Sequence, residues 1–284
     1  MDAAETLHRY TLFQSIVLHR VGQFTGGLLM MSQAKTRTYR VTWHAGLALM
    51  YGALCYLVFL CTVVYAIGFV GDLVVGKSID SGRVVSPLLA IVVDVALLSL
   101  FALQHSIMAR PAFKRWWKRF VPPPVERSTF VLFSSLVLLL LFWQWLPLPE
   151  TIWNLSDSVL RFLLFALYGA GWLIVLLSSC LIDHSALFGL RQVYLFWQGK
   201  DYTESGFRTP ALYRLVRHPM MVGFLIAFWA TPHLTGGHLL FSLAMTGYIF
   251  AGIHLEERDL LVYFGTLYRR YQQQVRMIVP VPKR

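Results

Sequence analysis

The sequence predicts an all-α integral membrane protein: a bundle of about five to six transmembrane helices that includes a C-terminal helical hairpin, preceded by an N-terminal interfacial amphipathic helix. Composition is the first observation, because 57% of the 284 residues are hydrophobic, 14% are charged and the mean hydropathy is +0.58. These values are far from those of a soluble domain. Several apolar stretches also reach the roughly 20 residues that a helix needs to cross the hydrocarbon. Lys and Arg gather in the loops beside them.

The first expected element is a helix that lies on the membrane surface within residues 1–42. Apolar side chains recur there at steps of three or four residues, with Arg9, His19 and Arg20 off the apolar stripe. The stripe consists of Leu7, Tyr10, Phe13, Val17, Val21 and Phe24. The segment lacks the short apolar core and the small-residue cleavage site of a signal peptide, so we expect no cleavage.

Residues 43–284 are expected to form one transmembrane domain, because no repeat or linker marks a second one. The predicted spans are Trp43–Val70, Pro87–Met108, Thr129–Leu148, Val159–Ile182 and a paired segment, Pro219–Leu255. The paired segment should be a hairpin with a short first arm. It is interrupted by Thr231, Pro232, Thr235, Gly236 and Gly237.

Basic residues predict the orientation of these six passes. They precede the first span, follow the second, and recur in residues 191–217 and in the tail, whereas residues 146–157 and 232–237 carry almost none. The positive-inside rule therefore predicts that both termini are cytoplasmic. The segment from Asp183 to Arg217 is too long for a tight connection and rich in aromatic residues, so it should fold onto the cytoplasmic face, where it can close a site.

Charge and cysteine content exclude several partners. The formal net charge is +11, but the cations lie beside hydrophobic spans, so anionic lipid headgroups are favoured and nucleic acid is not expected. The run of Lys, Arg and Trp over residues 114–119 is typical of a headgroup anchor. Cys55, Cys61 and Cys180 lie in apolar stretches without metal-type spacing, so neither a disulfide framework nor a metal site is expected. No obligate protein partner is evident.

Ionisable residues lie at both ends of the hairpin. His218 and Pro219 begin it, and Glu256 and Glu257 end it close to membrane depth, where carboxylates are costly unless paired. Arg217 and Arg258 are the expected partners. A structural ion-pair cluster and a functional site explain this pattern equally well.

These residues resemble the C-terminal signature of the isoprenylcysteine carboxyl methyltransferases, which are membrane enzymes that use S-adenosyl-L-methionine. The matching positions are Arg217, His218, Pro219, Gly223, Glu256, Glu257, Phe264, Gly265, Tyr268 and Tyr271. Further runs resemble a bacterial branch that is grouped with nurim, a multi-pass nuclear-envelope protein: LFALQHSIMARPAFKRWWKR, ERSTFVLFSSL, LLFWQWLP, DHSALFGLRQVYLF and FRTPALYRLVRHP. The resemblance covers roughly residues 43–280.

The resemblance implies a methyl transfer to a small volatile thiol, from methanethiol to dimethyl sulfide, in the cell inner membrane. It places the cofactor-binding part at about residues 183–280. One position departs from the signature, since Met221 stands where the wider family usually has Tyr. The implied cofactor-binding residues are His218, Pro219, Met221, Gly223, Glu256, Glu257, Tyr263 and Tyr268.

Physical chemistry is consistent with these assignments. A sulfonium cation favours aromatic faces and a nearby carboxylate. Candidates on what we expect to be one helical segment are Glu257, Tyr263, Phe264 and Tyr268. Glu257 is alternatively a ligand of the ribose or the ammonium group.

A thiol must lose its proton before it attacks, because the thiolate is the nucleophile. Asp183 and His184 adjoin at the end of the fourth span, and His105 ends the second, so either imidazole can serve as the base. Arg191 or Arg217 can instead stabilise the thiolate. The structural alternatives are that His105 bonds a helix end and that Asp183 only pairs with Arg191.

Three other functions remain open at this stage. The acceptor can be an isoprenylcysteine carboxylate or another lipid-borne group; the protein can be a reductase of the sterol-reductase type with a nicotinamide donor; or it can be a nurim-like scaffold without activity. No Gly-rich dinucleotide loop supports the reductase. The sequence leaves open the size of the acceptor, the base, the oligomeric state, the role of the N-terminal helix and whether methaneselenol is also accepted.

Overall fold

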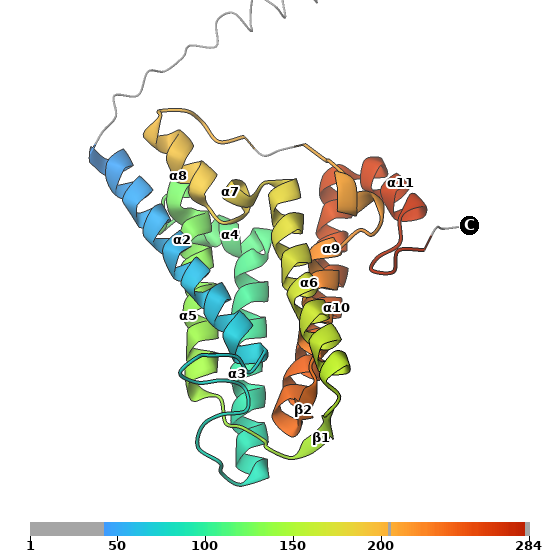
Figure 1. Ribbon diagram of the computed structural model, residues 1–284. Coiled ribbons are helices and arrows are strands. Elements are labelled where there is room, and N and C mark those ends of the chain that lie inside the picture. Colours follow the sequence, from blue (N-terminus) through green and yellow to red (C-terminus); the bar gives the residue numbers. More distant parts are fainter. Residues whose placement is uncertain (1–42, 204–205, 282–284) are drawn as a thin grey trace, which may run out of the picture. The chain divides into compact units, whose positions relative to one another are not determined.

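The computed structural model describes residues 43–203 and 206–281 (Figure 1). The surface helix expected within residues 1–42 lies outside the described residues. Five helices are long and apolar enough to cross a membrane: α2 (Trp43–Val70), α3 (Pro87–Ala109), α5 (Pro123–Gln144), α6 (Ser158–Ile182) and α10 (Gly236–Phe264). The chain is therefore a multi-pass, all-α membrane protein, as predicted.

The predicted C-terminal hairpin and its short first arm are confirmed, but the return arm extends nine residues beyond the predicted Leu255, to Phe264. The first arm is α9 (Pro219–Trp229), an apolar helix of 11 residues, and the return arm is α10 with 29 residues. Gly236 and Gly237 belong to the first turn of α10 instead of the interruption. The bend itself occupies residues 230–235.

The third predicted span is wrong at both ends. Helix α5 begins at Pro123, six positions before the predicted Thr129, because the prolines there suit a first helical turn. It ends at Gln144, before the predicted Leu148, because Trp145 adopts an extended backbone. The Trp145 indole is fully buried, and its Nε1 donates to the Ile79 carbonyl at 3.0 Å.

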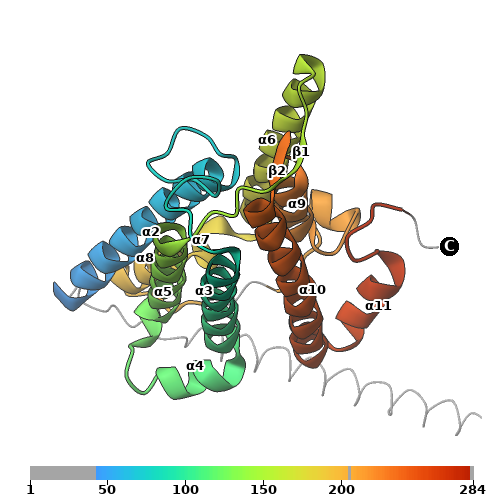
Figure 2. The same cartoon turned by 90° about the horizontal axis from the view of Figure 1, so that it is seen from below.

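The helices pack in two neighbouring sets that are visible from below in Figure 2. Helix α5 contacts α2 and α3, while α6 packs along α9, and α10 contacts both α3 and α9. The α6 and α9 backbones touch at Gly171 and Gly223. A Cβ built on Gly223 would lie 2.6 Å from the Gly171 carbonyl oxygen. Small residues allow this close approach in a membrane.

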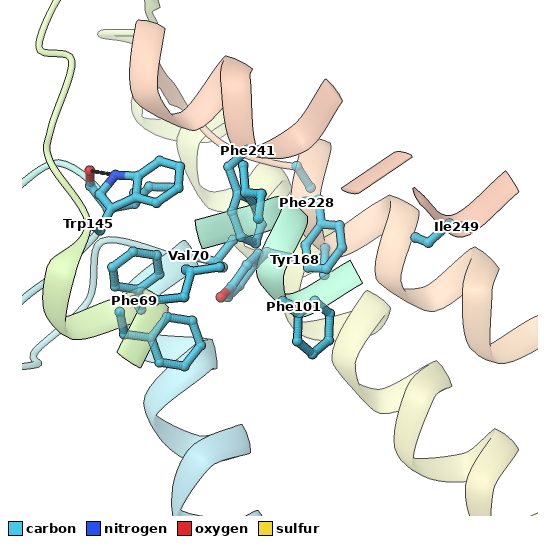
Figure 3. Packing of buried hydrophobic residues seen from close by; sticks show 14 of the residues in the cluster. Phe69, Val70, Phe101, Trp145, Tyr168, Phe228, Phe241 and Ile249 are labelled. Atoms are coloured by element: carbon cyan, nitrogen blue, oxygen red, sulfur yellow. Dashed lines mark hydrogen bonds between the residues drawn. The ribbon is translucent and has the colours of Figure 1, made fainter. Parts of the chain in front are cut away.

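An aromatic cluster fills the core between these sets (Figure 3). The Phe69 ring lies 4.7 Å from that of Phe142 and stands edge-on to Trp145. On the other side, Phe241 meets the rings of Trp145 and Phe228 edge-on. Helices α2, α5, α9 and α10 are thus joined through one apolar core.

A two-stranded sheet, which the sequence analysis did not predict, joins two connections at one end of the bundle. Strand β1 (Thr151–Asn154) pairs antiparallel with β2 (His233–Thr235), with Thr151 opposite Thr235. Next to it, Gly236 N donates to the Glu150 carbonyl at 2.7 Å. The pairing satisfies backbone groups in the turn of the hairpin, which would otherwise be unpaired near the hydrocarbon.

Short helices gather at the opposite end (Figure 1). They are α4 (Pro111–Trp117), α7 (His184–Leu187), α8 (Leu190–Trp197), the 3-10 helix η1 (Ala211–Arg214) and α11 (Thr266–Gln274). Helix α8 packs against α2 and α5, and its Val193 is fully buried. The prediction that the segment after Asp183 folds onto the bundle is confirmed for α7 and α8.

Candidate active site

The hairpin mouth, formed by residues 217–219 and 256–257, is held in place by the C-terminal segment. Pro219 begins α9, and the two residues before it bond the segment after α11: Arg217 N donates to the Arg276 carbonyl at 2.9 Å, and His218 N to the Met277 carbonyl at 3.1 Å. Both side chains are thereby held facing α10. Each is at most 9% exposed.

Glu257 on α10 is the centre of a buried polar cluster. Its Oε1 accepts from Arg217 Nε at 2.6 Å, His218 Nε2 at 3.1 Å and the Tyr268 hydroxyl at 3.2 Å. Its Oε2 accepts from Gln272 Nε2 at 2.9 Å. A buried carboxylate needs such charge-assisted partners. Because protein donors occupy both oxygens, we interpret Glu257 as the organiser of the cluster.

The same cluster ties α9 to α11. The second arm of the Arg217 guanidinium donates from Nη1 to the Val275 carbonyl at 2.6 Å, and the Tyr271 hydroxyl donates to the Tyr213 carbonyl. Burial raises the pKa of Tyr271 to about 12. Burial, and then the Glu257 charge, also raise the pKa of Tyr268. Both phenols therefore stay protonated and act as donors near neutral pH.

Glu256 lies beside this cluster but differs from Glu257 in exposure. Half of its side chain is exposed, and its Oε2 is 3.7 Å from His218 Nδ1. The expected pairing of Arg258 is wrong: Arg258 is exposed, and within residues 43–203 and 206–281 the ion pairs of the two glutamates involve Arg217 and His218 only. A half-exposed carboxylate next to a buried imidazole is suited to a cationic ligand.

The expectation that Glu257, Tyr263, Phe264 and Tyr268 share one helical segment is wrong. Helix α10 ends at Phe264, because Gly265 adopts a φ of +55° that favours glycine. Tyr268 lies on α11 and is 2% exposed, whereas Tyr263 is 67% exposed on the outer face of α10. Only Tyr268 of these two tyrosines belongs to the buried cluster.

Sequence reasoning missed Phe207, which packs over this region. Its ring centroid lies 5.2 Å from Phe264, 5.9 Å from Tyr268 and 5.4 Å from Tyr271. It comes from the irregular segment before η1, where no periodicity marks it. The irregular segment before η1, helix α10 and helix α11 thus each contribute aromatic rings to this region.

Two other predicted cofactor-binding residues, Met221 and Gly223, pack against neighbouring parts of the protein. Met221 is partly buried and packs against the apolar core. Gly223 faces Gly171 at the α6–α9 contact. A contact of either residue with a cofactor stays a prediction.

Asp183 and His184 face different partners although they are adjacent. The Asp183 carboxylate pairs with Arg191 and accepts from Ser185 Oγ at 2.8 Å and Ala186 N at 3.0 Å, which caps α7. Burial opposes its ionisation, but these donors together hold the pKa of Asp183 below its ordinary value. The Asp183–Arg191 ion pair is therefore present, while a part for Asp183 in the chemistry stays a prediction.

Both ring nitrogens of His184 make hydrogen bonds. Nε2 lies 2.7 Å from the Tyr56 hydroxyl, and Nδ1 lies 2.8 Å from Ser179 Oγ. Burial lowers the pKa of His184, which favours the neutral ring. Sequence reasoning missed Tyr56, because a tyrosine within an apolar span carries no local signal.

His105 lies apart from these groups, within α3. Its Nδ1 is 3.2 Å from Ser134 Oγ on α5, and its ring contacts Phe130. The bond is to a side chain in the interior of α5 and not to a helix end, which differs from the expected structural alternative. The structure therefore brings together Arg217, His218, Glu257 and Tyr268, and places His184 and His105 in two other contacts.

Comparisons with known proteins point to one family. The profile of the family described as NnrU protein matches residues 94–277. The methanethiol S-methyltransferase of Mycobacterium tuberculosis is 54% identical over 238 residues, which cover 84% of this chain and 98% of that protein. That of Crocosphaera subtropica is 51% identical, covering 82% and 91%. Nurim of Rattus norvegicus is 30% identical over 187 residues, which cover 63% of this chain and 71% of the nurim chain. No solved structure matches.

Proposed function

Because the chain belongs to the NnrU protein family, and within it to the methanethiol S-methyltransferases, we propose that it transfers a methyl group to the sulfur of methanethiol and releases dimethyl sulfide. The observation that carries the proposal is the 54% identity that extends over 98% of the mycobacterial enzyme. The buried cluster around Glu257 lies inside the matched residues 94–277.

We propose S-adenosyl-L-methionine as the methyl donor. The residues at the hairpin mouth fit this molecule, because Glu256 offers a half-exposed carboxylate to an ammonium group. Phe207 and Phe264 are partly exposed and offer aromatic faces to a sulfonium or an adenine ring, whereas Tyr268 is buried against Phe207. When bound, the cofactor supplies an activated methyl group. His218 and Arg217 are held in place by Glu257 and shape the mouth.

The protein's own contribution is positioning and proton removal. Methyl transfer is a single displacement, so the sulfur must lie in line with the methyl carbon at near-attack distance. The charge of Arg217 is already compensated by Glu257, which makes it a weak source of positive field for a thiolate. His184, whose pKa is lowered by burial, is the better candidate to accept the thiol's proton.

We also propose the location and partners. The end that carries α4, α7, α8 and α11 is rich in Lys and Arg, so it faces the cytoplasm of a cell inner membrane, with both termini on that side. Anionic headgroups meet the basic and aromatic surface of α4, where Trp116 is 47% exposed and Phe120, just beyond it, 67%. The other partner is the small thiol.

The test is methyl transfer by the purified protein in detergent. Labelled S-adenosylmethionine is offered with methanethiol in one vial and with a farnesylated cysteine analogue in another, and volatile and non-volatile products are counted separately. Labelled dimethyl sulfide from the first vial alone is the expected result. Label in the prenyl ester would move the acceptor to lipid.

A second candidate function is a scaffold without activity, which the similarity to nurim favours. The scaffold function predicts no labelled product in either vial and no binding of the labelled cofactor. In that case the polar cluster at the hairpin mouth would serve only to hold α9, α10 and α11 together.

A further inference from the structure

We propose that Tyr56 relays the thiol's proton to His184, and that Ser179 holds His184 in the tautomer that can receive it. The inference rests on the proposed function, since it names the residues that ionise the acceptor. It starts from the fact that His184 Nε2 and Nδ1 are both engaged, by Tyr56 from α2 and Ser179 from α6. An incoming thiol therefore reaches Nε2 only through the phenol oxygen.

The three contacts around His184 determine where its proton lies. The Ser179 hydroxyl donates its single hydrogen to the Leu176 carbonyl at 2.7 Å. Ser179 Oγ can then only accept from the ring, so Nδ1 carries the hydrogen. The lone pair of a neutral ring is consequently on Nε2, and the Tyr56 hydroxyl donates to it at 2.7 Å. For the neutral ring, this is the one assignment in which all three contacts are hydrogen bonds.

The same heavy-atom positions also suit the protonated ring. If Nε2 gains a hydrogen, it donates to the Tyr56 oxygen, while Nδ1 still donates to Ser179. No side chain must move between the two states. A base that takes up a proton and gives it back benefits from such a preorganised partner set.

The surroundings hold the ring rigidly. The Phe188 ring stands edge-on to His184 at 4.7 Å, and Arg127 Nε donates to the Leu187 carbonyl at 2.7 Å, which anchors the end of α7. The elements packed near His184 carry the ionisable groups Tyr56 on α2, Arg127 on α5, Cys180 on α6, Asp183 before α7 and Arg191 on α8, of which Tyr56 bonds the His184 ring. The Asp183–Arg191 ion pair compensates itself, so Tyr56 remains the titratable group in direct contact with His184.

The proton balance of the step is simple. The S–H bond breaks and a new O–H bond forms on Tyr56, while the original Tyr56 proton moves to His184 Nε2. The products are a thiolate and an imidazolium. The thiolate sulfur then forms its bond to the methyl carbon as the donor's carbon–sulfur bond breaks, and His184 returns its proton to water.

The first experiment measures kcat/KM for methanethiol against pH in Tyr56→Phe, in His184→Ala and in the double variant. Tyr51→Phe is the matched control, because Tyr51 lies on the same helix and bonds Thr129 instead. We expect kcat/KM of Tyr56→Phe to fall about 10- to 100-fold near neutral pH, which is at or below the lower end of general-base effects because His184 itself remains. The loss should shrink as rising pH ionises the thiol, and Tyr56→Phe should add nothing in the His184→Ala background.

A loss in Tyr56→Phe that stays constant with pH, or no loss at all, would overturn the relay while methyl transfer by the unchanged protein upholds the proposed function. An unchanged protein that methylates no thiol would overturn both. A measurement independent of activity uses ¹⁵N-histidine NMR on the unmodified protein, in which His184 should show its hydrogen on Nδ1. A hydrogen on Nε2 of the neutral ring would refute the assignment even if the variants did not fold.

Discussion

At the residue scale, the candidate site depends on the difference between two adjacent carboxylates. Glu257 is buried and saturated by Arg217, His218, Tyr268 and Gln272, whereas half of the Glu256 side chain is exposed. Burial of an ion is tolerated only with such a set of donors. We therefore propose an organising role for Glu257 and a ligand-binding role for Glu256.

Replacing Glu257 with Gln should destabilise the protein strongly. The change leaves Arg217 without its buried counter-ion, and breaking a buried pair typically costs about 3–5 kcal/mol. Thermal unfolding in detergent should show a large fall in midpoint. Glu150→Gln is the control, since Glu150 is exposed at the other end of the bundle. Equal midpoints for the two variants would contradict the organising role.

Replacing Glu256 with Gln should weaken cofactor binding without a comparable loss of stability. Its ion pair with His218 is long at 3.7 Å and half exposed, so it contributes about 1 kcal/mol or less to folding. If Glu256 meets the cofactor's ammonium group, the Kd should rise about tenfold, which corresponds to about 1.4 kcal/mol. Calorimetric titration with S-adenosylmethionine measures it. An unchanged Kd would remove Glu256 from the binding site.

His184 should make stability depend on pH. Burial lowers its pKa in the folded protein, so the unfolded chain takes up a proton first as the pH falls. Stability is therefore full above the ordinary histidine value of about 6.5 and declines as the pH falls from there to the lowered value. Unfolding midpoints between neutral and mildly acidic pH should show a decline that is smaller in His184→Asn. The same slope in both proteins would contradict the assignment.

Motif residues of the site were predictable from the sequence, but their environment was not. Arg217, His218, Glu256 and Glu257 stand out because ionisable groups near membrane depth are costly. Tyr56 and Phe207 have no such signal, since a tyrosine in a span and a phenylalanine in an irregular segment both suit a membrane protein in many places. Their places in the structure depend on contacts with residues more than fifty positions away.

At the scale of elements, hydrophobic length predicted the first, second and fourth spans to within one residue at each end but misplaced both ends of α5. The first predicted span coincides with α2, whereas α5 begins and ends earlier than the span that hydropathy predicts. The start of α5 depends on the prolines at residues 122–124. Its end depends on the buried Trp145 indole, which donates a hydrogen bond to the Ile79 carbonyl. The β1–β2 pairing joins two segments that are about 80 residues apart. The sequence of each segment, taken by itself, predicts only a loop.

Replacing Gly223 with Ala should separate α6 from α9. The added Cβ would meet the Gly171 carbonyl oxygen at 2.6 Å, and because backbone atoms cannot rotate away, the helices must move apart. Overpacking of this kind costs about 1–3 kcal/mol. Gly247→Ala on α10 is the control, because a Cβ there meets open space. Thermal unfolding should distinguish the two variants, and equal midpoints would argue against the tight contact.

At the scale of the whole molecule, the distribution of basic residues predicts the orientation in the membrane. Arg270 on α11 and Ile152 on β1 are both exposed, and α11 and β1 lie at opposite ends of the helix bundle (Figure 1). In a variant without Cys55, Cys61 and Cys180, a single cysteine in place of Arg270 should react with an impermeant maleimide only when the cytoplasmic face is accessible. Ile152→Cys should react from the outside of intact cells. The reverse pattern would invert the proposed topology.

The short arm of the hairpin also constrains how the protein enters the membrane during its synthesis. Helix α9 has 11 residues, which at about 1.5 Å per residue is about half of the roughly 30 Å hydrocarbon thickness. Helix α9 is therefore too short to cross the hydrocarbon as a separate span, and we expect α9 and α10 to insert as one unit. Strand β1 precedes β2 by about 80 residues, so it is synthesised first, and we expect it to be available for pairing with the turn when α9 and α10 insert.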